Sequence, residues 1–182
     1  MTLTAPPVRA AAPRVRRRGR VVDIVLVAAL LLVGVRLFVL EPVEVPSGSM
    51  APTLAAGSHV LVDHVGPRLT GYHRGDVVVL TSPTDGTLLV KRVAGVAGDD
   101  VSILDGVLTV DGVAVHEPWV DPGDVDSVYT EMGVVPEGHV LVLADHRQEA
   151  LDSRTFGPVR LADLQGRVLA TVWPLDRVGG TS

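Results

Sequence analysis

The sequence contains no cysteine among its 182 residues. Disulfide scaffolds, cysteine nucleophiles and thiolate metal sites are therefore excluded. Aromatic residues are also scarce, at 3% of the chain against 47% for all hydrophobic residues, so the core must be built from Val, Leu, Ile and Ala. The six histidines are scattered without the spacing of a metal-binding motif such as H-E-x-x-H. We expect neither a metal nor another cofactor.

Lysine is nearly absent as well. Of the 16 basic residues 15 are Arg, and Lys91 is the single Lys. Arg supplies charge and hydrogen bonds but does not lose its proton in a protein, whereas a Lys amine does so when its pKa is lowered. Lys91 is therefore a candidate for acid–base chemistry that Arg cannot perform. The alternative is that it is one ordinary Lys that remains by chance.

Charge is distributed unevenly along the chain. Residues 1–20 contain six Arg and no acidic residue, whereas residues 21–182 contain 10 basic and 21 acidic residues, a net charge of −11. An acidic body argues against a nucleic-acid partner, because binding to phosphates requires basic side chains. The basic N-terminal arm needs another explanation.

The longest apolar segment covers residues 21–40, with an uninterrupted apolar run over residues 24–35. Twenty helical residues span about 30 Å, the thickness of a hydrocarbon core. Asp23 and Arg36 flank the run, where their charged groups can reach the interface. Three interpretations compete: a membrane helix, a cleaved signal peptide and a buried helix. The segment has no Ala-x-Ala-like site after it and no polar positions at helical spacing, which favours a retained membrane helix.

The Arg cluster predicts a cytoplasmic N-terminus by the positive-inside rule. The expected organisation is a basic cytoplasmic tail over residues 1–20, a membrane helix over residues 21–40 and an extracytoplasmic domain over residues 41–182. This arrangement would place the protein in the cell membrane, with a single pass and with lipid as a partner.

Short runs rich in Val and Leu, broken by Gly, Pro and Asp, follow the apolar segment and are typical of strands. They cover residues 59–63, 76–80, 87–93, 101–104, 107–110, 113–115, 139–143 and 166–172. The pairs Asp105-Gly106 and Asp111-Gly112 predict two-residue hairpin turns, which require positive φ at both positions. The predicted class is mainly β, with a meander over residues 101–115 inside a small β extension at about residues 98–136, and without an amphipathic helix.

Two segments carry residues suited to one reaction. Residues 45–54, VPSGSMAPTL, present Ser hydroxyls on a turn bounded by Pro and Gly, and residues 90–99, VKRVAGVAGD, place Lys91 among apolar neighbours. Burial lowers the pKa of a Lys, and a neutral amine within reach can take the proton of a Ser hydroxyl. The alternative for the first segment is a plain turn rich in Ser and Gly.

With two further segments, RGDVVVL at residues 74–80 and VPEGH to DSRTFGP at residues 135–158, they resemble the conserved segments of type I signal peptidases. These enzymes are membrane-anchored serine proteases that remove signal peptides from exported preproteins. The resemblance covers about residues 21–179, and the combination of P-S-G-S-M-x-P-T-L, K-R-V-x-G and D-S-R-x-F-G is specific, although each motif alone would be weak. It implies an antiparallel signal-peptidase-like β domain and substrates with small residues at positions −1 and −3 from the cleaved bond.

The resemblance also implies roles for individual residues. Ser49 matches the nucleophile and Lys91 the general base, while the Ser47 hydroxyl and the Ser49 backbone N–H match the oxyanion hole. Val45 and Val90 match residues that line the substrate pockets, although both could be plain core. An ion-pair network near the site is matched by Arg92, Asp145, Arg147, Asp152 and Arg154.

Three positions depart from the family pattern. Ala144 and His146 stand in Ala-Asp-His-Arg where the family usually has Gly-Asp-Asn-Arg, and Ala150 replaces a Ser that often hydrogen-bonds the catalytic amine. We predict an active enzyme. The departures leave open a weak or inactive membrane-anchored paralogue that binds signal peptides. A soluble self-cleaving repressor of related fold, which would carry a DNA-binding domain, fits the N-terminal arm and apolar segment poorly.

Overall fold

The structure is a computed structural model that describes residues 17–121, 123, 129–148, 150–174 and 179. Most of the expected basic tail, residues 1–16, lies outside the described residues. The chain divides into two compact units, residues 1–37 and residues 38–182. Each unit is described by itself.

The first unit contains most of helix α1, which covers Arg17–Val39. Residues 21–33 of this helix are exposed. The side chain of Arg36 lies outside the described residues. The helix ends before Leu40, which starts strand β1 and was wrongly assigned to the apolar helix. Within the described part of the chain, no helix combines the length and the apolar character needed to cross a membrane.

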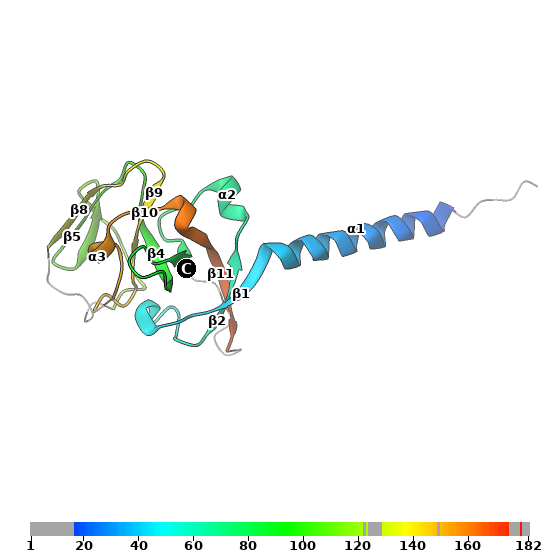
Figure 1. The fold of residues 1–182 in the computed structure, drawn as a ribbon, viewed down its shortest axis with the longest axis horizontal. Coiled ribbons are helices and arrows are strands. Elements are labelled where there is room, and N and C mark those ends of the chain that lie inside the picture. Colours follow the sequence, from blue (N-terminus) through cyan, green and yellow to red (C-terminus); the bar gives the residue numbers. More distant parts are fainter. Residues whose placement is uncertain (1–16, 122, 124–128, 149, 175–178, 180–182) are drawn as a thin grey trace, which may run out of the picture. The chain divides into compact units, whose positions relative to one another are not determined.

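The second unit is built on a seven-stranded sheet in which every pair of neighbouring strands is antiparallel. Its strand order is β1-β2-β11-β3-β4-β9-β10, so the last strand of the chain lies between β2 and β3. Figure 1 shows β11 beside β2. The expected mainly β class is confirmed. The strands are β1 (Leu40–Glu44), β2 (His59–Asp63), β3 (Val77–Thr81), β4 (Leu88–Val96), β9 (His139–Leu143), β10 (Val159–Arg160) and β11 (Leu164–Trp173).

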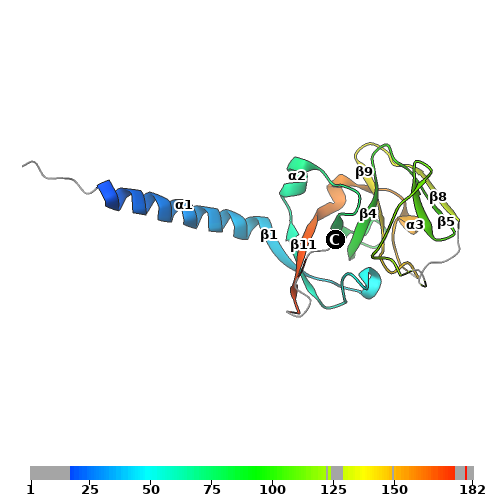
Figure 2. The ribbon, with the colours of Figure 1, turned by 180° about the vertical axis from the view of Figure 1, so that it is seen from behind.

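A second, four-stranded antiparallel sheet follows β4. It contains β5 (Asp100–Leu104), β6 (Val107–Val110), β7 (Val113–Ala114) and β8 (Thr130–Val134) in the order β7-β6-β5-β8. Both Asp-Gly turns are confirmed, with φ of 50° and 77° at residues 105 and 106 and of 53° and 75° at residues 111 and 112. Figure 2 shows β5 and β8 together at one end of this unit, with β1 and β11 near the other end.

Helical segments in the second unit are short. They are η1 (Gly48–Met50), α2 (Gly66–Thr70), α3 (Ser153–Phe156) and η3 (Leu161–Asp163). The Asp152 carboxylate caps α3 by accepting a hydrogen bond from the Arg154 backbone N–H at 3.0 Å.

One core cluster fixes the position of η1 above the main sheet. Met50 and Leu54 are fully buried, and they pack with valines of β2, β3 and β4 such as Val60, Val79 and Val90. The core therefore has the aliphatic composition that the shortage of aromatics predicted. Because Met50 directly follows Ser49, its burial holds the Ser49 backbone against the sheet.

Candidate active site

Ser49 lies on η1, immediately before the buried Met50. Its carbonyl oxygen accepts a hydrogen bond from the His146 backbone N–H at 3.0 Å. Its hydroxyl oxygen lies 3.1 Å from the Ser47 Oγ, which donates to it. The Ser49 backbone is thus held by packing on one side and by the segment at residues 144–147 on the other. We call this segment the 144–147 loop.

Lys91 approaches Ser49 from β4. Its amine donates a hydrogen bond to the Ser49 hydroxyl, with 2.7 Å between Nζ and Oγ. The side chain is 1% exposed, and burial lowers the pKa of the amine from 10.5 to about 8. The carboxylates of Asp152 and Asp145 oppose this lowering, and the Arg154 guanidinium adds to it. An amine with this pKa is a usable base close to neutral pH.

Ser47 caps η1, and its hydroxyl is exposed beside Ser49. The Ser49 backbone N–H points toward the Ser47 Oγ, with 3.5 Å between nitrogen and oxygen. A hydroxyl and an N–H therefore lie on the same side of the turn, next to the Ser49 Oγ. Two such donors can stabilise an oxyanion that forms on a carbonyl attacked at this position.

Val45 and Val90 lie in the core cluster beneath η1, where both are buried. In the chain without a substrate they pack as core residues. Their predicted place in the walls of substrate pockets stays a prediction.

Arg92 and Asp145 form a buried ion pair on the other side of β4. Two guanidinium nitrogens, Nε and Nη2, donate to the carboxylate at 2.9 and 2.8 Å. The Thr53 hydroxyl donates to the same carboxylate at 2.6 Å, and Arg92 Nη1 donates to the Gly75 carbonyl at 2.9 Å. The pair therefore ties β4 to the 144–147 loop and to the turn that follows Ser49.

Asp152 and Arg154 hold the 144–147 loop from its other end. The fully buried Asp152 carboxylate accepts hydrogen bonds from the Ala144 backbone N–H at 3.1 Å and from the Arg154 Nε at 2.9 Å. Arg154 Nη2 donates to the Arg147 carbonyl at 2.6 Å, and Arg147 Nε donates to the Ala144 carbonyl at 2.7 Å. The five charged residues predicted near the site thus meet at this loop.

The departures occupy this same region. Ala144 is fully buried, and both its backbone polar groups are hydrogen-bonded. His146 contributes its backbone N–H to Ser49. Ala150 is half-buried. Within the described part of the chain, the amine of Lys91 makes one hydrogen bond, to Ser49.

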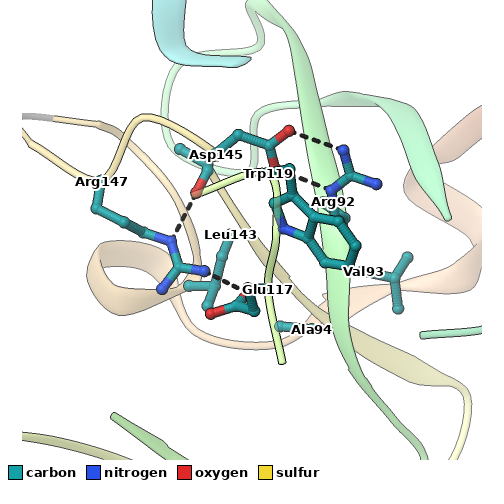
Figure 3. Close-up of a pocket in the computed structure, with 9 residues that line it drawn as sticks. Arg92, Val93, Ala94, Glu117, Trp119, Leu143, Asp145 and Arg147 are labelled. Carbon is teal, nitrogen blue, oxygen red and sulfur yellow. Dashed lines mark hydrogen bonds and ion pairs between the residues drawn. The ribbon is translucent and has the colours of Figure 1, made fainter. Parts of the chain in front are cut away.

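Three further residues belong to this network and were not predicted from the sequence: Thr53, Glu117 and Trp119. Figure 3 shows the Trp119 ring lying over Arg92 and the Glu117 carboxylate facing Arg147. Trp119 is one of only two tryptophans in the chain, and this rarity was the one available signal. Among the described residues, no cluster of three or more His, Asp or Glu is placed to hold a metal ion.

Comparison with known families gives one decisive match. The family model for signal peptidase, peptidase S26, matches residues 18–173. The chain belongs to this peptidase family. The family expected from the motifs is therefore confirmed, and the protein is a peptidase.

Two curated relatives agree with the family match. The chain is 34% identical over 160 residues to a probable signal peptidase I-2 of Synechocystis sp., covering 84% of this chain and 72% of the relative. It is 32% identical over 168 residues to signal peptidase IB of Staphylococcus aureus, covering 84% and 87% of the two chains. A crystal structure of a signal peptidase I from Enterococcus faecalis matches at 29% identity and a TM-score of 0.48, over 53% of this chain and 95% of that chain.

Proposed function

We propose that this signal peptidase family member is a membrane-anchored serine endopeptidase that removes N-terminal signal peptides from exported preproteins. Ser49 is the nucleophile and Lys91 the general base. The observation that carries the proposal is the 2.7 Å contact between the Lys91 Nζ and the Ser49 Oγ, made by a buried amine whose pKa is lowered to about 8.

The reaction follows from this contact. The neutral Lys91 amine takes the proton of the Ser49 hydroxyl as Oγ attacks the carbonyl carbon of the cleaved bond. The Ser47 hydroxyl and the Ser49 backbone N–H stabilise the oxyanion of the tetrahedral intermediate. The protonated amine then gives its proton to the leaving amine, which departs as the new N-terminus. Water, deprotonated by Lys91, hydrolyses the remaining acyl-enzyme.

The substrate class follows from the family and from the shape expected around the serine. Small side chains at positions −1 and −3 would fit shallow apolar pockets, and Val45 and Val90 are the candidates to shape them. Both lie directly beneath η1 in the core cluster. No nucleic acid takes part in the reaction.

We assign the apolar residues 21–39 of α1 to the membrane anchor, residues 1–20 to a cytoplasmic tail and residues 40–182 to the extracytoplasmic peptidase domain. Uncharged apolar residues fill positions 24–35, and the side chains of residues 21–33 are exposed in the isolated chain, a large apolar surface to leave in water. An anchor in the same bilayer as the substrate's apolar segment raises the effective concentration of the cleavage site.

The assignment of Lys91 as the base predicts the pH dependence of the reaction. Only the neutral amine accepts a proton, and with a pKa of about 8 about a tenth of it is neutral at pH 7. We expect kcat/KM to rise about tenfold per pH unit below pH 8 and to level off above it. The measurement is kcat/KM between pH 6 and 10 on a soluble peptide. A flat profile across this range would contradict the assignment.

The proposed function is tested with a preprotein that carries Ala at positions −1 and −3. Detergent-solubilised protein is expected to release the mature chain with a single new N-terminus after the −1 Ala, identified by mass spectrometry. The matched substrate with Leu at both positions should be cleaved at least about 100-fold more slowly, since a shallow pocket excludes the larger side chain. The Ser49→Ala protein, prepared identically, controls for contaminating proteases and should be inactive.

The alternative is a protein that binds signal peptides without cleaving them. It is motivated by Ala150, because Lys91 has one hydrogen bond within the described residues where the family pattern would supply another. Binding of the preprotein by the wild-type protein without any Ser49-dependent product would favour this alternative over the peptidase.

A further inference from the structure

Residues 115–121 follow β7, the edge strand of the small sheet, and pack against the main sheet; we call them the 115–121 segment. Two of its side chains, Glu117 and Trp119, line a small pocket together with Arg92, Asp145 and Arg147 (Figure 3). None of these five side chains takes part in the Ser49–Lys91 contact. Arg92 is adjacent to Lys91 in sequence, and Asp145 and Arg147 flank His146, whose backbone N–H binds the Ser49 carbonyl. The 115–121 segment can therefore affect Ser49 and Lys91 only indirectly, through Arg92, Asp145 and Arg147.

Glu117 is the counter-charge of Arg147. The Arg147 Nη2 donates to the Glu117 Oε1 at 2.5 Å, and the side chains are 3% and 10% exposed respectively. A buried guanidinium without a carboxylate partner is costly, so this contact helps to fix where Arg147 lies. Burial raises the pKa of Glu117, and Arg147 opposes the rise. The Arg147 guanidinium thus favours the charged form of this carboxylate.

Arg147 transmits this placement to the nucleophile. Its Nε binds the Ala144 carbonyl at 2.7 Å, which closes the 144–147 loop on itself. Between these two residues, the His146 backbone N–H holds the Ser49 carbonyl at 3.0 Å. A displacement of Arg147 would move the backbone group that fixes Ser49. Three contacts in series therefore connect Glu117 to the backbone of the serine.

Trp119 contacts Arg92, the residue that follows Lys91. The Arg92 Cζ lies 4.1 Å from the centroid of the Trp119 ring, within the range of a cation–π contact. Arg92 directly follows Lys91 on β4, and its guanidinium is already bound by Asp145 and by the Gly75 carbonyl. The indole covers the remaining face, and Arg92 is 4% exposed. Trp119 therefore helps to hold Arg92 in place on the strand that carries Lys91.

We propose that Glu117 and Trp119 are positioning residues, which fix the distance between the Ser49 Oγ and the Lys91 Nζ through Arg147 and Arg92. The proposal rests on the proposed function, because it assigns the two residues to the chemistry of that pair. The proposal also assigns a role to the four-stranded sheet β7-β6-β5-β8. This sheet positions the 115–121 segment, which supports the residues around Ser49 and Lys91 without contacting the reacting atoms.

Two variants test the proposal, Glu117→Gln and Trp119→Leu. Each should lower kcat about 10- to 100-fold, because a small misplacement of reacting groups has effects of this size, and should leave KM within about twofold. The conservative variants Glu117→Asp and Trp119→Phe should recover part of the lost rate. The controls Glu131→Gln and Tyr129→Leu remove exposed side chains of the small sheet and of the residue before it, and should behave as the wild type.

A second readout does not depend on catalysis. Lys91 is the only lysine, so protein labelled with ¹³C at the lysine Cε gives a single NMR signal from this residue, and its titration reports the pKa of the catalytic amine. If the contacts of Glu117 or Trp119 are lost, the Ser49 turn and β4 are held less firmly and water can reach the Lys91 amine. The desolvation that lowers the pKa of this amine then becomes smaller. Glu117→Gln and Trp119→Leu should therefore raise the pKa of Lys91 above the wild-type value, and the two controls should leave it unchanged.

The outcomes separate this proposal from the one it rests on. If kcat and the Lys91 titration are both unchanged in folded Glu117→Gln and Trp119→Leu, the positioning role is wrong while the peptidase stands. If KM rises and kcat does not fall, the two residues bind substrate instead, which also overturns the proposal. If wild-type protein does not cleave preproteins, the proposed function is wrong, and the NMR titration alone still decides whether the segment controls Lys91. If a variant does not fold, its conservative partner carries the same comparison.

Discussion

Lys91→Arg is expected to lower kcat by about 10⁴-fold or more, although the substitution keeps a positive charge at this position. The guanidinium does not release its proton at any pH at which the protein is folded, so it cannot accept the proton of the Ser49 hydroxyl. A role of Lys91 that was limited to charge or hydrogen bonding would survive this change, at least in part. The measurement is the single-turnover rate of preprotein cleavage by detergent-solubilised protein.

Lys91→Met is the matched variant, because it fills a similar volume and has neither charge nor basicity. It should be as inactive as Lys91→Arg and should be more stable than the wild type. Lowering the pKa from 10.5 to about 8 corresponds to a cost of about 3 kcal/mol for the charged amine in the folded chain. Between these two pH values the unfolded chain binds more protons, so the wild type gains stability as pH rises, and below pH 8 the whole cost is present.

The stability difference is measured at pH 7 by denaturant unfolding followed through tryptophan fluorescence. Lys91→Met should have the higher free energy of unfolding at pH 7, and the difference should shrink toward pH 10.5. Substantial cleavage by Lys91→Arg would show that another group is the base. Equal stability of Lys91→Met and wild type at pH 7 would show that the amine is not desolvated in the folded chain.

Asp145→Asn is expected to lower the free energy of unfolding by about 3–5 kcal/mol. The substitution leaves the guanidinium of Arg92 buried without a counter-charge, and it weakens the hydrogen bond from Thr53. Because the same carboxylate ties the 144–147 loop to β4, we also expect activity to fall at temperatures where the variant remains folded. The free energy is obtained from denaturant unfolding of wild type and variant at the same pH.

A control with the same geometry and different burial is present in the chain. Arg160 binds Asp163 through two nitrogens at 2.8 and 2.9 Å, close to the distances in the Arg92–Asp145 pair. The side chains of Arg160 and Asp163 are 68% and 29% exposed, whereas those of Arg92 and Asp145 are 4% and 1% exposed. Asp163→Asn should therefore change stability little, since water screens an exposed pair. Similar losses in both variants would mean that burial does not set the cost.

The sequence predicted those parts of the fold that depend on local chemistry. The runs at residues 59–63, 107–110 and 139–143 form β2, β6 and β9 with the same bounds, and both Asp-Gly pairs form their turns. It missed β1, β8 and β10, because their residues carry little strand signal: β1 contains Pro42 and two Glu, and β10 has two residues. These strands exist because a neighbouring strand offers hydrogen-bonding groups, and that information is not local.

The site shows the same division. The motifs led to Ser49 and Lys91, which the fold brings into contact, and to the charged residues at the 144–147 loop. Glu117 and Trp119 lie in a stretch without a motif, and their partners are 30 and 27 residues away in sequence. A pairing between a carboxylate and one of 15 arginines cannot be read from composition or spacing. Only the packing of the small sheet against the main sheet selects it.

The position of β11 also determines when the main sheet can be completed during synthesis. The turn with Ser49 connects β1 to β2, Lys91 lies on β4, and in the main sheet these two parts are joined only through β11, the strand made last. Chains emerge from the ribosome with the N-terminus first, so the two halves of the sheet stay unjoined until residues 164–173 are available. The hydrogen-bonded ladder that links the strands flanking the Ser49 turn to the strand carrying Lys91 is therefore completed only when the last strand has been made.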